Sequence, residues 1–198
     1  MKILVARLET EHRSLEKLAN LLGNFPVDLS RTHPTIAEAT LLVDVLSYLT
    51  QFPDVHHHPV EDRMVESLRA IDALPVDLGE EIERQHHVLA RQGKALMRDL
   101  ESAARQETAS WPQLPLEIRL YAERLRHNMA VEELALFPLA VAALTDDDAR
   151  AIDTHILDAP HDPLFVDTAT TRFAELRRII AAETDCGCMD NPAAETKE

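Results

Sequence analysis

The sequence predicts an all-α fold, an up-down-up-down four-helix bundle followed by a C-terminal helical extension. The chain of 198 residues holds only four glycines and is rich in alanine, leucine, glutamate and arginine, which favour helices. Apolar residues recur at helical spacing over four long segments joined by short connections. Four such helices pack by default as an antiparallel bundle.

The first predicted helix spans about residues 2–22 and ends at Gly23. The second is expected to begin near Pro34 or Thr35 and to reach about Ile71, with a break or kink at Pro53. Their apolar stripes consist of Val5, Leu8, Leu15, Leu18 and Leu22 in the first helix and of Leu42, Leu46, Leu49, Met64 and Leu68 in the second.

The third predicted helix spans about residues 77–105, and the fourth about residues 116–144 with a bend at Pro138. A short helix follows in "LTDDDAR", and a last one is expected over about residues 167–183. The stripes of the third and fourth helices consist of Ile82, Leu89, Leu96 and Leu100, and of Leu120, Leu134 and Phe137. We therefore expect the bundle in residues 1–145, a helical extension packed on it in residues 146–185, and a disordered tail in residues 186–198.

Charge and composition exclude several classes of partner. The formal charge of −15 argues against nucleic acid and against an anionic membrane surface, because both would repel the chain. No apolar run reaches the roughly 20 residues that cross a bilayer, and "MKILVARLETEH" becomes charged too early for a signal peptide. The sequence thus predicts a cytoplasmic protein. Cys186 and Cys188 are too few for a disulfide framework, and we expect them in a frayed end rather than in a metal or redox site.

A histidine interrupts each apolar stripe, and acidic residues accompany two of the four histidines. The interrupting residues are His12, His57 with Glu61, His86, and His127 with Glu132. At a rise of about 1.5 Å per residue in an antiparallel bundle, the four interruptions lie within roughly one or two turns of one another. The helices therefore bring imidazoles and carboxylates to one level of the core.

Such a buried polar cluster needs compensation, since each uncompensated ionised group would cost several kcal/mol. A bound cation supplies it. Nitrogen and oxygen ligands without thiolate suit iron, manganese or zinc, and two carboxylates able to bridge favour two irons over one zinc. His57 and Glu61 share a helical face, whereas His127 and Glu132, five residues apart, need a π-bulge or long Glu rotamers.

Two simpler interpretations compete with the metal site. A single histidine on an apolar stripe is more often a satisfied core residue than a ligand. A metal-free acid-base site, with Glu61 as general base and His57 as its partner, is the other alternative. Neither explains why all four helices contribute.

The pieces "ETEHRSLEKL", "FPDVHHHPVED", "IERQHHVL" and "LRHNMAVEELALFP" resemble hemerythrin-like proteins, the HHE cation-binding family, over about residues 1–145. The segment "DAPHDPLF" and the helix after it resemble the extension of longer bacterial members. The resemblance implies a left-handed four-helix bundle that holds two iron ions with an oxo or hydroxo bridge. The residues that match the family's ligands are His12, His57, Glu61, His86, His127 and Glu132.

The third helix departs from the oxygen-carrying members, which have H-x-x-x-H there. Ile82 and Ala90 stand one turn before and after His86, and a register that uses Glu83 and His87 is the alternative. The remaining histidines are expected around the ligands or at the surface (His56 and His58) and as solvated or capping residues (His33, His155 and His161).

The missing imidazole favours redox chemistry over reversible oxygen carriage, because it leaves ligand positions to water or to a carboxylate. Hemerythrin-like proteins of iron-sulfur repair carry a cysteine-bearing N-terminal domain, which this sequence does not show. We expect a stand-alone di-iron protein that binds or senses oxygen, nitric oxide or peroxide, with redox activity possible. A non-catalytic iron-binding or interaction module and an oxygen carrier are the alternatives.

Overall fold

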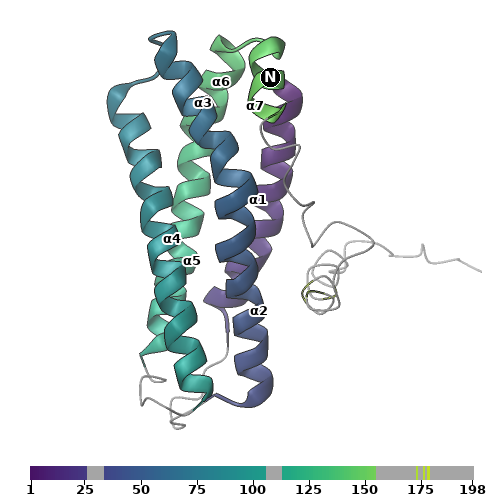
Figure 1. The fold of residues 1–198 in the computed structure, drawn as a ribbon, viewed down its shortest axis with the longest axis vertical. Helices are drawn as coiled ribbons and strands as arrows, with labels where there is room; N and C mark the ends of the chain where they lie inside the picture. Colours follow the sequence, from purple (N-terminus) through teal and green to yellow (C-terminus); the bar gives the residue numbers. More distant parts are fainter. Residues whose placement is uncertain (26–33, 106–112, 155–172, 174–175, 177, 179–198) are drawn as a thin grey trace, which may run out of the picture.

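The computed structural model describes residues 1–25, 34–105 and 113–154, together with residues 173, 176 and 178. The described residues form helices and no strand, which confirms the all-α prediction (Figure 1). The elements in chain order are α1 (Lys2–Gly23), α2 (Ile36–Phe52), η1 (Pro53–His57), α3 (His58–Ala70), α4 (Val76–Ala104), α5 (Leu114–Val131), η2 (Glu132–Leu136), α6 (Phe137–Ala143) and α7 (Asp146–Thr154).

Four long rods make the bundle. They are α1, the continuous run α2–η1–α3, α4, and the run α5–η2–α6 (Figure 1). α2 packs against α4, α4 against α5, and α5 against α1. The short α7 lies beside the first turns of α1 and contacts α3 (Figure 1). Its Asp146 pairs with the Met1 ammonium group and its Asp153 with Arg7.

The apolar core is divided into two clusters, and the polar level lies between them. On α1, Leu8 belongs to one cluster and Leu15 to the other, with His12 between them. On α4, Ile82 and Leu89 flank His86 in the same way. Of the predicted extension, the structure describes α7 and residues 173, 176 and 178, and Phe173 and Leu176 are buried in the cluster that contains Leu15. The other residues of the extension and the tail lie outside the described residues.

The predicted stripes of the first three helical segments are buried throughout, but the stripe of the fourth is wrong. Leu120 is 45% exposed and Leu134 is 81% exposed, although Phe137 is buried as predicted. The inward line of α5 instead runs through Ile118, Tyr121, Ala122, Leu125 and Met129. Leu120 and Leu134 belong to a line of residues seven apart that lies on the outer face of the helix.

Both composite rods contain a π turn just before a proline. In η1 the His58 N–H bonds to the Pro53 carbonyl, and in η2 the Phe137 N–H bonds to the Glu132 carbonyl, each five residues back. Pro59 and Pro138 follow, and neither has an N–H to continue the regular ladder. The expected break at Pro53 is therefore a π turn within a continuous helix, and π turns are frequent at functional sites.

No single helix among the described residues is long and apolar enough to cross a bilayer. One pair, Leu114–Ala143 with Asp146–Thr154, reaches that length and composition only together, and it is bent by 117°. The cytoplasmic location stays a prediction. His33, His155, His161, Cys186 and Cys188 lie outside the described residues.

Candidate metal centre

Four imidazoles and two carboxylates converge between the two apolar clusters. They fall into two overlapping groups, His12, His57, Glu61 and Glu132 in one, and His58, Glu61 and His86 in the other. Every residue of a group offers one potential ligand atom, and the ligand atoms of that group all lie within 4.8 Å of one another. All six side chains are buried.

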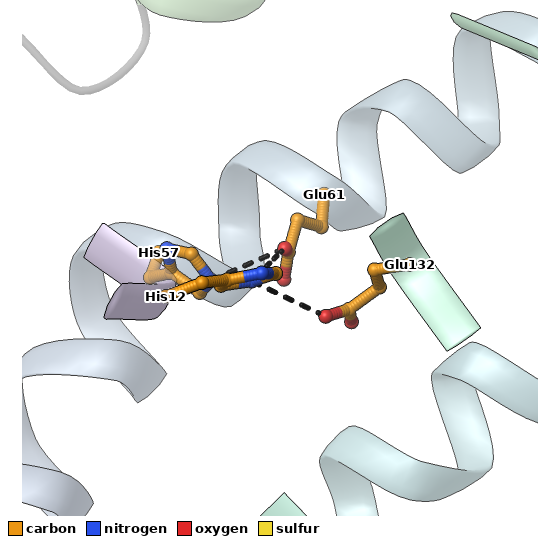
Figure 2. A group of neighbouring side chains, drawn as sticks. All are labelled: His12, His57, Glu61 and Glu132. Atoms are coloured by element: carbon orange, nitrogen blue, oxygen red, sulfur yellow. Dashed lines mark hydrogen bonds and ion pairs between the residues drawn. The ribbon is translucent and has the colours of Figure 1, made fainter. Parts of the chain in front are cut away.

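The first group brings α1, the α2–η1–α3 rod and η2 together (Figure 2). The Nε2 atoms of His12 and His57 are 2.9 Å apart. Glu61 Oε1 lies 3.1 Å from His57 Nε2 and 3.3 Å from His12 Nε2. Glu132 Oε2 approaches His12 Nε2 to 3.5 Å.

The second group lies on the side of α4. His86 Nε2 is 2.9 Å from Glu132 Oε1 and 3.5 Å from Glu61 Oε2. The His58 ring stacks on the His86 ring with centroids 4.2 Å apart and an angle of 16°.

The two carboxylates therefore each span both groups. Glu61 directs Oε1 toward His12 and His57 and Oε2 toward His86. Glu132 directs Oε2 toward His12 and Oε1 toward His86. A carboxylate with one oxygen toward each of two nitrogen groups has the orientation of a ligand that bridges two ions.

The spacing of the donor atoms fits metal ions. Two ligand atoms about 2.1 Å from one ion and at right angles to each other lie about 3.0 Å apart. The contact of 2.9 Å between His12 and His57, and that of 3.1 Å between His57 and Glu61, match this spacing. Within the described part of the chain, Glu61 Oε1 and Oε2, Glu132 Oε2 and His58 Nε2 are buried without a hydrogen bond. Buried polar atoms are normally satisfied, so these four point to a ligand.

A carboxylate stands behind each of the four imidazoles. The Nδ1 atom of His12 donates to Glu133 at 2.9 Å, that of His57 to Glu11 at 2.7 Å, and that of His86 to Asp62 at 2.8 Å. The Nδ1 of His58 lies 3.3 Å from Asp54. Such partners fix the ring and its tautomer, which leaves Nε2 as the atom that faces the centre.

Without metal, the positive charge of protonated histidines balances the negative charge of the buried carboxylates. Burial would lower the pKa of His57, but Glu61 and Glu11 outweigh burial and raise that pKa to about 10. Burial also opposes protonation of His86, but its contacts with Asp62, Glu132 and Glu61 outweigh burial and raise its pKa to about 12. Metal ions would have to displace these protons, so binding should release them.

The two carboxylates differ in their protonation. Burial favours the neutral form of Glu61, but the surrounding histidines, His57 first, hold its pKa well below the usual value. For Glu132, burial and the neighbouring charge of Glu61 raise the pKa. Burial lowers the pKa of His58, which keeps that imidazole neutral and its Nε2 able to ligate.

Five of the six predicted ligands meet at the centre, and His127 does not. Its side chain is exposed on the outer face of α5, on the same line as Leu120 and Leu134. Asn128 faces inward instead and donates from Nδ2 to Glu132 Oε1 at 2.6 Å. The π turn begins only at Glu132, so it does not draw His127 toward the core.

His58 is the central residue that the sequence prediction missed. It is 6% exposed and faces the second group, whereas its neighbour His56 is only half-buried and stacks on Phe52. On α4 the structure places His86 inward and His87 on the exposed face. Glu83, of the alternative register, is paired with Arg69 at 2.9 Å.

The chain belongs to the hemerythrin family. The sequence model described as the hemerythrin HHE cation binding domain matches residues 3–140, which includes every residue of the centre. No curated protein and no solved structure gave a significant match. A cation-binding domain with a buried cluster of histidine and glutamate is thus shown by family and by geometry.

Proposed function

We propose that this protein holds two iron ions at the centre and uses them to bind or sense oxygen, peroxide or nitric oxide. The observation that carries the proposal is the orientation of Glu61 and Glu132, each with one oxygen toward either group of imidazoles. Two bridging carboxylates in a helical bundle are the arrangement on which carboxylate-bridged metal pairs are built. Imidazole and carboxylate without thiolate suit iron, manganese or zinc.

In this proposal the chain gives each ion a similar set of ligands. His12 and His57 would hold one ion, and His58 and His86 the other, with one oxygen of Glu61 and one of Glu132 for each. Four protein ligands for each ion would leave room for a small molecule to bind there. The iron pair, when bound, would supply electrons to oxygen or peroxide, or a binding position for nitric oxide.

A surface pocket gives small molecules a path to the centre. It has a volume of about 390 Å³, lies between α3 and α4, and includes His58 and His86 in its wall. Pro59 and Ala90 also line this pocket, together with the longer side chains of His87 and Lys94. A second pocket of about 530 Å³ between α1 and α5 reaches His12 from the opposite side. Small molecules therefore need no large rearrangement to reach either half.

The ligand set favours redox chemistry over reversible oxygen storage. Storage needs an iron pair that gives electrons to oxygen and takes them back, and imidazole-rich ligation protects that cycle. Here Ile82 on α4 and Asn128 on α5 stand at the polar level without adding an imidazole. The two shared carboxylates bring negative charge to the site, and negative charge stabilises a ferric pair relative to a ferrous pair.

The test is the visible spectrum of the iron-reconstituted protein, recorded under nitrogen and then in air. We expect the reduced protein to oxidise to a stable diferric form, with any oxygen adduct short-lived, and to react readily with peroxide or nitric oxide. An adduct that persists and discharges when the oxygen pressure falls would make the protein a carrier. Iron bound without any reaction toward oxygen or peroxide would make it a non-catalytic iron-binding module.

A further inference from the structure

A positively charged groove lies on the outer side of α4, beside α5. Arg91, Lys94 and Arg98 follow one another along α4 at spacings of three and four residues, and Arg124 joins them from α5. Val88 and Ala95 form part of the floor of this groove, whose volume is about 500 Å³. None of the described residues that line it is acidic. We call it the α4 groove.

This concentration of positive charge is unusual for the chain. The sequence has 35 acidic against 20 basic residues, and several arginines elsewhere are paired with acids, as Arg69 is with Glu83 and Arg126 with Glu16. Within the described ranges, Arg91, Lys94 and Arg98 make no ion pair. Like charges three and four residues apart repel each other along a helix, so an anionic partner would relieve this repulsion.

The α4 groove lies next to the metal centre. His86 is on the inner face of α4, and the groove is on the outer face of the same helix, whose full diameter is about 10–12 Å. Lys94 lines both the α4 groove and the pocket that includes His58 and His86 in its wall. A partner seated on the groove would therefore lie beside the path to the centre.

The length of this row of positive charges limits the kinds of anion that can bind in the groove. Arg91 to Arg98 covers about 10 Å of the helix axis at about 1.5 Å per residue, too long for one phosphate group to contact all three cations. The formal charge of −15 for the whole chain opposes a long polyanion such as nucleic acid. A folded protein with a local cluster of carboxylates meets both conditions, because only that cluster faces the groove.

We propose that the α4 groove docks a small acidic electron-transfer protein that reduces the centre. This inference rests on the proposed function, since it assumes a ferric pair to be reduced. Each donor of the one-electron class gives up one electron and is itself oxidised. Two successive donors convert two ferric ions to two ferrous ions, and no bond within the chain forms or breaks.

The experiment uses the iron-loaded full chain with an acidic plant-type ferredoxin as the probe. The groove variant carries Arg91→Gln, Arg98→Gln and Arg124→Gln, which line the groove but not the pocket beside His58 and His86. The matched control carries Lys2→Gln, Arg119→Gln and Arg150→Gln, which removes the same charge at exposed positions outside the groove and both pockets. Glutamine keeps good helix propensity at these positions, and thermal melts check that both variants fold.

Two readouts are compared, the affinity for oxidised ferredoxin and the second-order rate at which reduced ferredoxin reduces the diferric form. In the groove variant we expect the rate to fall by about 10-fold or more at low salt, with weaker binding and a flatter salt dependence. The control should keep nearly the rate of the unmodified protein. Reduction by reduced lumiflavin, a small donor that needs no docking, should be unchanged in both variants.

The possible outcomes separate the two proposals. Equal slowing in both variants, or no slowing in either, overturns docking at the α4 groove. Loss of binding to a short single-stranded DNA in the groove variant, with ferredoxin binding unchanged, overturns it in favour of nucleic acid. A chain that takes up no iron pair, or whose iron lumiflavin cannot reduce, contradicts the proposed function, while ferredoxin titration of the metal-free variants still tests docking.

Discussion

Replacing His58 by alanine should remove one of the two metal ions and leave the metal-free fold almost as stable as before. His58 is buried, its Nε2 has no hydrogen bond among the described residues, and its ring stacks on that of His86. It is the one imidazole besides His86 in the second group of ligands. The variant therefore tests the one central residue that the sequence prediction missed.

The size of the effect follows from the number of ligands. Loss of a partner that merely holds a ligand weakens metal binding 10- to 100-fold, so loss of one of four ligands should cost at least about 100-fold, or about 2.8 kcal/mol. For the metal-free protein, the variant loses a ring stack and a contact of 3.3 Å with Asp54. It also removes an unsatisfied buried nitrogen whose burial costs about 1–3 kcal/mol, so the free energy of unfolding should change by less than about 1.5 kcal/mol.

The assay is an anaerobic titration with ferrous iron in competition with a coloured chelator, followed by thermal unfolding of the metal-free protein. His56→Ala, His87→Ala and His127→Ala serve as controls, because these side chains are exposed or half-buried and outside the centre. His58→Ala and His86→Ala should each bind about one iron tightly, and the controls about two. Two tightly bound irons in His58→Ala, or a loss in His127→Ala, would refute this assignment of ligands.

Three further predictions follow from the same geometry. Glu11→Gln keeps an acceptor for His57 Nδ1 but loses the negative charge beside it, so metal affinity should fall about 10-fold in the same titration. The control Glu16→Gln disturbs a surface pair with Arg126 and should leave the metal affinity unchanged. Ile82→His places an imidazole one turn from His86, and stopped-flow spectra should show a longer-lived oxygen adduct than in the unmodified protein. An unchanged lifetime of the adduct would contradict the role given to the missing imidazole. In the metal-free protein, the raised pKa of His57, about 10 against 6.5 when unfolded, gives stability that is full below pH 6.5 and is lost as the pH rises toward 10. The melting temperature of the metal-free protein should therefore fall over that range, and its gap to the metal-loaded protein should widen; a gap that narrows with rising pH would contradict the protonated state described above.

The sequence was sufficient for the fold and for most of the centre because helical periodicity and polar interruptions carry that information. On α1 and α4 the apolar residues around His12 and His86 allow only one inward face, and those histidines lie on it. His57 and Glu61 are one turn apart on one rod, so their common orientation was also predictable.

Two positions could not be predicted from an ideal helix. On α5, Leu120, His127 and Leu134 form a line of residues seven apart that looks apolar, while the true inward line contains Asn128, which is neither apolar nor ionisable. Adjacent residues on a regular α-helix point about 100° apart, so His57 on the inward face does not predict an inward His58. The π turn before Pro59 changes that geometry, and the proline was its one signal in the sequence.

The same combination, a helical pattern that continues across a proline, occurs at Pro138. There the π turn begins at Glu132 itself. Both central carboxylates therefore lie at or within about one turn of such an irregularity, Glu61 four residues after His57 and Glu132 at the first position of η2. A proline inside a long helical pattern with nearby histidine or glutamate is the feature that would have revealed this centre more completely.

The most direct test of the central claim is the iron content of the reconstituted protein, measured together with its EPR spectrum after oxidation in air. The account predicts about two irons per chain and almost no EPR signal, because two ferric ions that share the bridging carboxylates Glu61 and Glu132 couple magnetically. One iron per chain with the signal of an isolated ferric ion, or one zinc with no capacity for iron, would contradict it.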